Sequence, residues 1–148
     1  MSEPLRLERR VPGTAEQVWA HLTEPGLVPR WLADGAIPPA VGEIFVLRFD
    51  LATLPERTQH GGAVRGVVTA FDRPHVLEYA WEVGPLEETD DDTPPNDVSI
   101  VRFELAPRVD SVALVLTHRR VGDADRARIA ASWEAHLDLL ANALSSPR

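Results

Sequence analysis

The sequence contains no cysteine, which excludes disulfide bonds and thiolate chemistry. It also lacks lysine: all 15 basic residues are Arg, and they are scattered from Arg6 to Arg148. With 23 acidic residues the formal net charge is −8. An acidic chain whose basic residues do not cluster on one face repels phosphate backbones. We therefore expect no nucleic-acid partner.

Long apolar runs are missing as well. No stretch approaches the ~20 uncharged apolar residues that a membrane span needs. Residues 1–6 have no apolar segment behind their charges and do not have the pattern of a signal peptide. We therefore expect a cytoplasmic protein with no membrane span.

Two common catalytic motifs are absent too. The glycines at 61, 62 and 66 do not stand between a strand and a helix, as a phosphate-binding loop requires. No serine lies in a Gly-x-Ser-x-Gly nucleophile elbow. The sequence thus supports neither a hydrolase triad nor a phosphate-binding loop, and we expect no cofactor.

Six segments are rich in β-branched or aromatic residues and are bounded by Gly, Pro or Asp. This composition, with apolar residues at alternate positions, is typical of strands in a sheet that has one wet face. The predicted strands are Leu5–Val11, Ile44–Asp50, Ala63–Asp72, Val76–Val83, Val98–Ala106 and Val112–Arg120. The acidic segment Gly84–Asp97 is predicted to be a solvated loop, and its spacing does not match a calcium-binding loop.

Helices or helical turns are indicated at three places. Thr14 with Gln17 three residues later forms a capping box, which predicts a short helix over Ala15–Leu22. A second short helix or turn follows around Pro25 and Pro29. A long helix is predicted over Asp123–Leu144, because this range has no Gly or Pro and its apolar residues recur every three or four positions. That stripe consists of Ile129, Trp133, His136, Leu137, Leu140 and Leu144.

This order of elements predicts a single α+β domain over residues 1–148. A rod of about 22 residues is ~33 Å long, and it buries its apolar stripe best by lying across a whole sheet. A twisted sheet that curls around a straight helix cannot touch it along its full length. Large side chains fill the gap, or it remains as a pocket.

The residues expected around this gap combine apolar walls with a few polar tips, the mixture that a small-molecule pocket needs. The predicted ligand-binding residues are Trp31, Phe45, Phe49, Tyr79, Trp81, Phe103, Leu116, His118, Trp133, His136 and Leu137.

Several of these residues have a purely structural alternative. Trp31, Trp81 and Trp133 line the pocket or simply belong to the core. Tyr79 orients a ligand hydroxyl or reaches solvent at the pocket mouth. Trp19 is interpreted as a packing residue.

His118 is the one weak catalytic candidate, because an ordinary histidine pKa near 6.5 allows proton transfer at neutral pH. Its alternative is a hydrogen-bonded histidine beneath the helix. His118 and His136 lack a third ligand at a suitable spacing, so we predict no metal site. Arg48 and Arg102 are interpreted as surface charges.

Eight short motifs occur in an order that resembles a known superfamily. They are residues 11–19, 31–32, 41–43, 66–74, 77–81, 101–105, 114–118 and 132–137. The chain is similar to START-like (SRPBCC, Bet v-like) domains, and among these to bacterial domains related to the activator of the heat-shock-protein-90 ATPase. The resemblance implies a helix-grip fold: a curved six-stranded antiparallel sheet wrapped around a long C-terminal helix, with two short helices after the first strand.

The superfamily includes lipid carriers, binders of hormones and secondary metabolites, polyketide cyclases and a chaperone cofactor. The resemblance therefore implies binding or carriage of a hydrophobic lipid, polyketide-like or aromatic metabolite. One alternative is an enzyme of cyclase, dehydratase or hydrolase type in the same cavity. Another is a chaperone-partner or stress-response domain, although the eukaryotic activators engage the chaperone through an additional N-terminal domain that this sequence does not show. An exposed edge strand allows a homodimer, but nothing in the sequence requires one.

Overall fold

The predicted antiparallel sheet is present. The computed structural model describes residues 4–48, 63–83, 99–121 and 126–145. Within them, six strands pair in the order β1-β6-β5-β4-β3-β2. Their bounds are β1 Leu5–Pro12, β2 Ile44–Arg48, β3 Ala63–Asp72, β4 Val76–Val83, β5 Ser99–Pro107 and β6 Ser111–Arg119. The strand predictions are confirmed to within one residue at each described end.

Three helical segments accompany the sheet: α1 (Ala15–Thr23), the 3-10 turn η1 (Val28–Arg30) and α2 (Arg126–Ser145). The capping box of α1 is confirmed, because Thr14 Oγ1 accepts from the Gln17 amide at 3.1 Å and Gln17 Oε1 accepts from the Thr14 amide at 2.8 Å. The second short helix is a single turn that contains Pro29. The predicted cap of α2, Asp123, lies outside the described residues, as does the acidic loop predicted at Gly84–Asp97.

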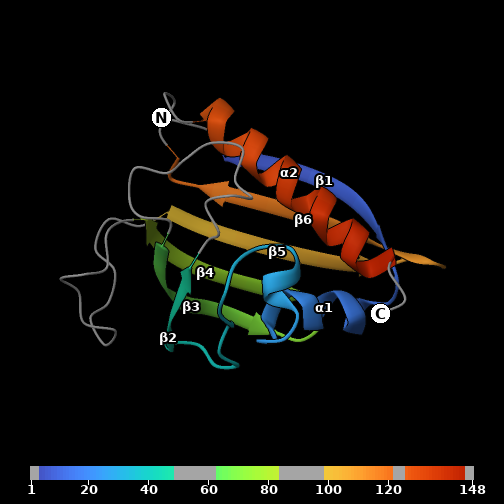
Figure 1. The fold of residues 1–148 in the computed structure, drawn as a ribbon, viewed down its shortest axis with the longest axis horizontal. Coiled ribbons are helices and arrows are strands. Elements are labelled where there is room, and N and C mark those ends of the chain that lie inside the picture. The colour runs from blue at the N-terminus through green and yellow to red at the C-terminus, as the bar shows by residue number, and fades with distance from the viewer. Residues whose placement is uncertain (1–3, 49–62, 84–98, 122–125, 146–148) are drawn as a thin grey trace.

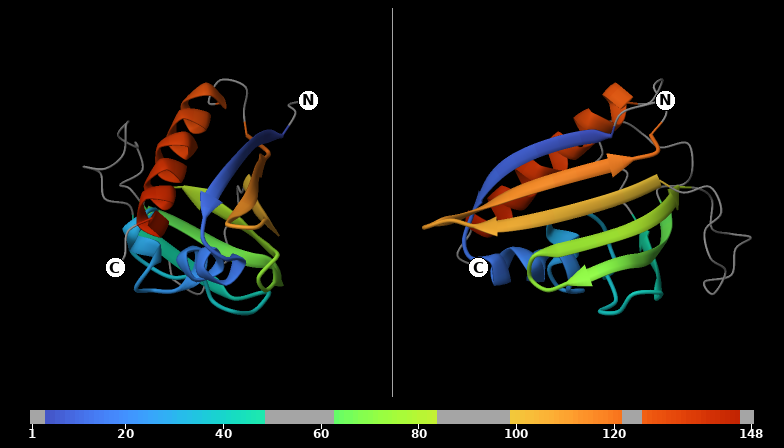
Figure 2. Two further views of the ribbon diagram at one scale, coloured as in Figure 1. Left: turned by 90° about the vertical axis from the view of Figure 1, so that its right-hand side faces the viewer. Right: turned by 180° about the vertical axis from the view of Figure 1, so that it is seen from behind.

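All three helical segments lie on one face of the curved sheet (Figure 1). Seen from behind, the sheet partly covers α2, which runs diagonally beside β1 (Figure 2). The strands turn alternate residues toward this face. On β5 these are Val101, Phe103 and Leu105, which are all buried. The helix-grip arrangement is therefore confirmed, with the core between the sheet and the helices.

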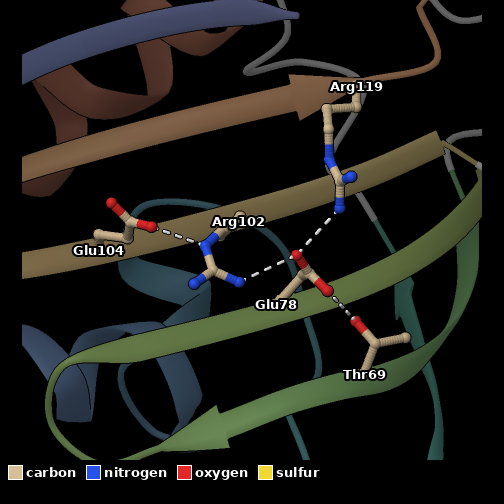
Figure 3. Close-up of polar contacts among 5 residues, drawn as sticks. All are labelled: Thr69, Glu78, Arg102, Glu104 and Arg119. Atoms are coloured by element: carbon tan, nitrogen blue, oxygen red, sulfur yellow. Dashed lines mark hydrogen bonds and ion pairs between the residues drawn. The ribbon is translucent and has the colours of Figure 1, made fainter.

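The opposite face of the sheet is polar. Glu78 accepts hydrogen bonds from Thr69 at 2.8 Å, from Arg119 at 3.1 Å and from Arg102 at 3.2 Å (Figure 3). Arg102 also donates to Glu104 at 2.7 Å. The prediction that Arg102 is a surface charge is confirmed. Because a one-residue slip would turn every side chain to the other face, this network fixes which residues of β4 and β5 face α2.

Candidate functional site

Eight rings meet between the sheet and the helices, and we call them the aromatic core. They come from the turn after η1, from four strands and from α2, and each residue is at most 6% exposed. The members of the aromatic core are Trp31, Phe45, Tyr79, Trp81, Phe103, His118, Trp133 and His136. Two further predicted residues, Leu116 and Leu137, are fully buried in the same region. Phe49 lies outside the described residues.

Trp133 of α2 is the centre of this group. Its ring stacks on Trp81 with the centroids 5.8 Å apart and the planes 6° apart. It meets Phe103, His118 and His136 edge to face, at centroid distances of 6.0, 6.1 and 6.3 Å. These offset and edge-to-face geometries are the favourable ones for aromatic pairs. One helix residue thus contacts rings from β4, β5 and β6.

Gly66 of β3 leaves room for another ring of the aromatic core. It lies opposite Phe45 on β2 and opposite Trp81 on β4. A Cβ atom at this position would come within 2.5 Å of Phe45 Cζ and 2.7 Å of the Ala80 carbonyl oxygen. The missing side chain therefore allows the Phe45 ring to lie against the sheet and to meet Tyr79 at a centroid distance of 5.1 Å.

Tyr79 carries a polar group into this apolar region. The residue is 1% exposed and contacts the rings of Phe45, Trp81 and Phe103. Burial raises the pKa of its hydroxyl far above the ordinary value, and no hydrogen bond to that hydroxyl is found among the described residues. Tyr79 is thus one residue of the aromatic core whose hydroxyl no described residue uses.

His118 of β6 is held from both sides. Trp133 Nε1 donates to His118 Nδ1 at 3.0 Å, and His118 Nε2 lies 2.7 Å from Ser99 Oγ. Burial lowers the pKa of His118 to about 4, so the ring is neutral at neutral pH. Because an indole N–H can only donate, Nδ1 must accept, and the single ring proton lies on Nε2.

His136 has the other tautomer. Its Nδ1 donates to the Ser132 carbonyl oxygen at 2.8 Å, one helical turn earlier. Burial lowers the pKa of His136, although this hydrogen bond opposes the shift. His136 and His118 each contact Trp133. In the part of the chain that the structure describes, no group of three His, Asp or Glu side chains could hold a metal ion.

Two tryptophans lie at the edge of this arrangement. Trp31 Nε1 donates to the His21 carbonyl oxygen at 2.6 Å, and its ring meets Phe103 edge to face. Trp19 packs against Phe71 instead, 5.2 Å away, and has no ring contact with the aromatic core among the described residues. The interpretation of Trp19 as a packing residue agrees with this position.

Ser99 was not among the residues predicted from the sequence. The period-two pattern of β5 contains a signal for it, because Ser99 lies two residues before Val101 and hence on the same face. Ser99 lies beside His118 because β5 pairs with β6, and a pattern within one strand does not predict which strands pair.

Comparisons with solved structures find the same fold in other proteins. Protein BPP1335 from Bordetella parapertussis is 32% identical with a TM-score of 0.71, over 98% of this chain and 76% of that one. Protein MLL2253 from Mesorhizobium loti is 23% identical with a TM-score of 0.77, over 99% of both chains. DynU16, described as a putative protein in the dynemicin biosynthetic locus, is 18% identical with a TM-score of 0.74. This chain spans 49% of its length.

No curated protein matches the sequence. Among the described residues, no helix is long and apolar enough to cross a membrane. The family model described as "Activator of Hsp90 ATPase homolog 1-like protein" matches residues 12–145, which is nearly the whole chain. With the helix-grip fold and the order of motifs, this match establishes that the chain belongs to the activator-of-Hsp90-ATPase-homologue-like family of START-like domains.

Proposed function

We propose that this domain binds a hydrophobic small molecule, a lipid or a polyketide-like or aromatic metabolite, within the aromatic core. The observation that carries the proposal is Tyr79, a residue that lies among aromatic rings and whose hydroxyl makes no hydrogen bond to any described residue. A fold that needs only an apolar core gains nothing from this oxygen, whereas a bound ligand with a polar group would satisfy it.

The surrounding rings would supply most of the affinity. Apolar area removed from water contributes roughly 25 cal/mol per Å², so a ligand that loses about 200 Å² gains about 5 kcal/mol. Because apolar contacts discriminate little between ligands, the shape of the site and its few polar groups would determine which ligand binds. Tyr79, His118 and His136 are the residues that we expect to orient the polar end, and His118, whose two ring nitrogens contact Trp133 and Ser99, would do so through Ser99.

The structural relatives agree with a ligand of this class. DynU16 is described as a protein of a biosynthetic locus, and it has the fold of this chain across its matched part. A fold does not by itself fix a function. The likeness supports testing polyketide-like and aromatic metabolites beside fatty acids.

Native mass spectrometry and thermal unfolding test the proposal. We would incubate the purified protein with panels of fatty acids and of aromatic polyketides. A ligand at a hundred times its Kd stabilises the folded state by about 2.7 kcal/mol, which is a measurable rise in Tm. A one-to-one complex with such a rise is the expected result. Failure of every apolar compound to bind would refute the proposal.

A pair of variants on β6 shows where the ligand binds. Leu116 faces the aromatic core, and its neighbour Val115 faces the other side of the sheet. Leu116→Phe should weaken binding because the larger ring occupies the ligand's space, while Val115→Phe should not. Equal affinities of the two folded variants would contradict binding in the core. If Leu116→Phe does not fold, the binding loss expected for Tyr79→Phe tests the same location.

The enzyme alternative has a physical obstacle at His118. A general base needs a basic nitrogen within reach of the substrate and a pKa near the working pH. Here the lone pair of Nδ1 accepts from Trp133, and burial lowers the pKa to about 4. This arrangement suits an orienting role. Turnover of a bound compound that is abolished in His118→Ala, with binding retained, would favour the enzyme instead.

The chaperone partner also stays a prediction. It is tested by adding the protein to the chaperone of the same organism and measuring ATP hydrolysis. Stimulation that survives in Tyr79→Phe and Leu116→Phe would indicate an interaction that does not need the aromatic core.

A further inference from the structure

The directions of the hydrogen bonds around His118 determine the role of the Ser99 hydroxyl. Trp133 Nε1 carries one hydrogen and has no lone pair to offer. Its 3.0 Å contact therefore makes His118 Nδ1 an acceptor. The neutral ring then has its proton on Nε2, and across the 2.7 Å contact Nε2–H donates to Ser99 Oγ.

Ser99 consequently uses its oxygen as an acceptor toward His118. Its own hydroxyl hydrogen must point elsewhere, and no described residue accepts it. Were the histidine tautomer reversed, Ser99 would donate to the ring and its hydrogen would be satisfied. Trp133 prevents that reversal, so an indole on α2 decides the direction of a hydroxyl on β5.

The position of Ser99 puts this donor next to the proposed ligand. Ser99 lies directly opposite Trp81 in the pairing of β4 with β5, and Tyr79 lies opposite Val101, two residues further. Such diagonal neighbours on one face have their Cα atoms ~7–8 Å apart, within the span of one small ligand. Two hydroxyls whose hydrogens no described residue accepts thus share this face, with Tyr79 buried and Ser99 half-buried.

The charges around these hydroxyls restrict the ligand group that they fit. His118 is neutral at neutral pH, since burial lowers its pKa to about 4. Arg9, which faces α2 from β1, is held by Glu134 and Asp138 at 2.7 Å each. A carboxylate brought into the core would therefore lose water without meeting an available cation among the described residues on this face of the sheet, which is costly. A neutral oxygen that accepts hydrogen bonds avoids this cost.

We propose that Ser99 Oγ–H, oriented by the His118–Trp133 pair, donates to a neutral carbonyl oxygen of the bound molecule, so that the domain selects ketones, esters or amides over their hydrocarbon counterparts. The inference rests on the proposed function. It makes Ser99 a determinant of ligand specificity and Trp133 a positioning residue that acts through His118.

Matched probes that differ only at the carbonyl test this. We would use fluorenone with fluorene, and 2-tridecanone with tridecane, and would follow binding by native mass spectrometry and by tryptophan fluorescence. Wild-type protein should prefer the ketone in at least one pair. Ser99→Ala should weaken ketone binding about fivefold, which is one net hydrogen bond of about 1 kcal/mol, and should leave the hydrocarbon unchanged. Ser99→Thr keeps the hydroxyl and should keep the preference.

The direction of the hydrogen bonds has a separate readout. ¹⁵N NMR of the histidine ring should show His118 protonated at Nε2 in the wild type, and this preference should be lost in Trp133→Phe together with the ketone preference. Equal affinities of the wild type for hydrocarbon and ketone would overturn the inference, and so would an equal loss of both affinities in Ser99→Ala. Either result would leave the proposal of ligand binding intact. If neither member of either pair binds to wild-type protein, ligand binding and the inference both fail.

Discussion

Replacing Tyr79 by phenylalanine should raise the stability of the ligand-free protein and lower its affinity for a polar ligand. The side chain is 1% exposed, and its hydroxyl has no hydrogen bond to any described residue. A buried polar group without a partner costs about 1–3 kcal/mol. Phenylalanine keeps the ring and its contacts and removes only the oxygen. We therefore expect a gain of up to about 1 kcal/mol in the free energy of unfolding.

Urea unfolding and thermal unfolding both measure this gain. For a domain of 148 residues, 1 kcal/mol corresponds to a rise of about 2–4 °C in Tm. Affinity should change in the opposite sense. A ligand that hydrogen-bonds to the Tyr79 hydroxyl would lose about 1 kcal/mol of binding free energy in the variant, so its Kd would rise about fivefold. An ordinary core tyrosine would not show these opposite signs.

The result that refutes this reasoning is a loss of stability. If Tyr79→Phe destabilises the ligand-free protein by about 1 kcal/mol, the hydroxyl already has a partner in the folded state. Unchanged affinity for every ligand that binds would equally remove Tyr79 from the binding residues.

Three further predictions follow from the same region. Tyr79 is the single tyrosine, so ultraviolet absorbance of tyrosinate should stay absent above pH 10 until the protein unfolds, and stability should fall there because only the unfolded state ionises. Gly66→Ala should displace the Phe45 ring and destabilise the fold by about 1–3 kcal/mol in urea unfolding. His118 should make stability fall between about pH 6.5 and pH 4, by about 3 kcal/mol in all, because the unfolded ring binds a proton there and the folded ring does not.

Two of these predictions have a matched control variant. His118→Gln should remove the pH-dependent difference, and His75→Gln, at an exposed position, should leave it unchanged. A Gly26→Ala variant, at a position with open space around the added Cβ, should cost much less than Gly66→Ala. Tyrosinate that appears in the folded protein near pH 10 would contradict the burial of Tyr79. Profiles of wild type and His118→Gln that coincide below pH 6.5 would contradict the low pKa of His118.

Much of the fold follows from patterns along the chain. The β-branched composition of Ala63–Asp72 and the alternation over Val76–Val83 predicted both strands at their observed bounds, because such residues fit a sheet with one wet face. The capping box at Thr14 predicted where α1 begins, since both of its hydrogen bonds are local. The C-terminal end of β5 and both ends of β6 differ from the predicted ends by one residue, because strand ends depend on the pairing of neighbouring strands; the predicted start of β5, Val98, lies outside the described residues.

The sequence by itself determined the strands, the apolar stripe on α2 and the aromatic residues that face it, because these depend on the period of the backbone. Only the tertiary structure decided that Trp133 donates to His118 Nδ1, that Ser99 stands beside Nε2, and that Phe45 lies over Gly66. These contacts join residues from different strands and from α2. The register of the strand pairs and the docking of α2 on the sheet create these contacts. A residue pattern within one strand or helix does not predict the direction of a hydrogen bond between different elements.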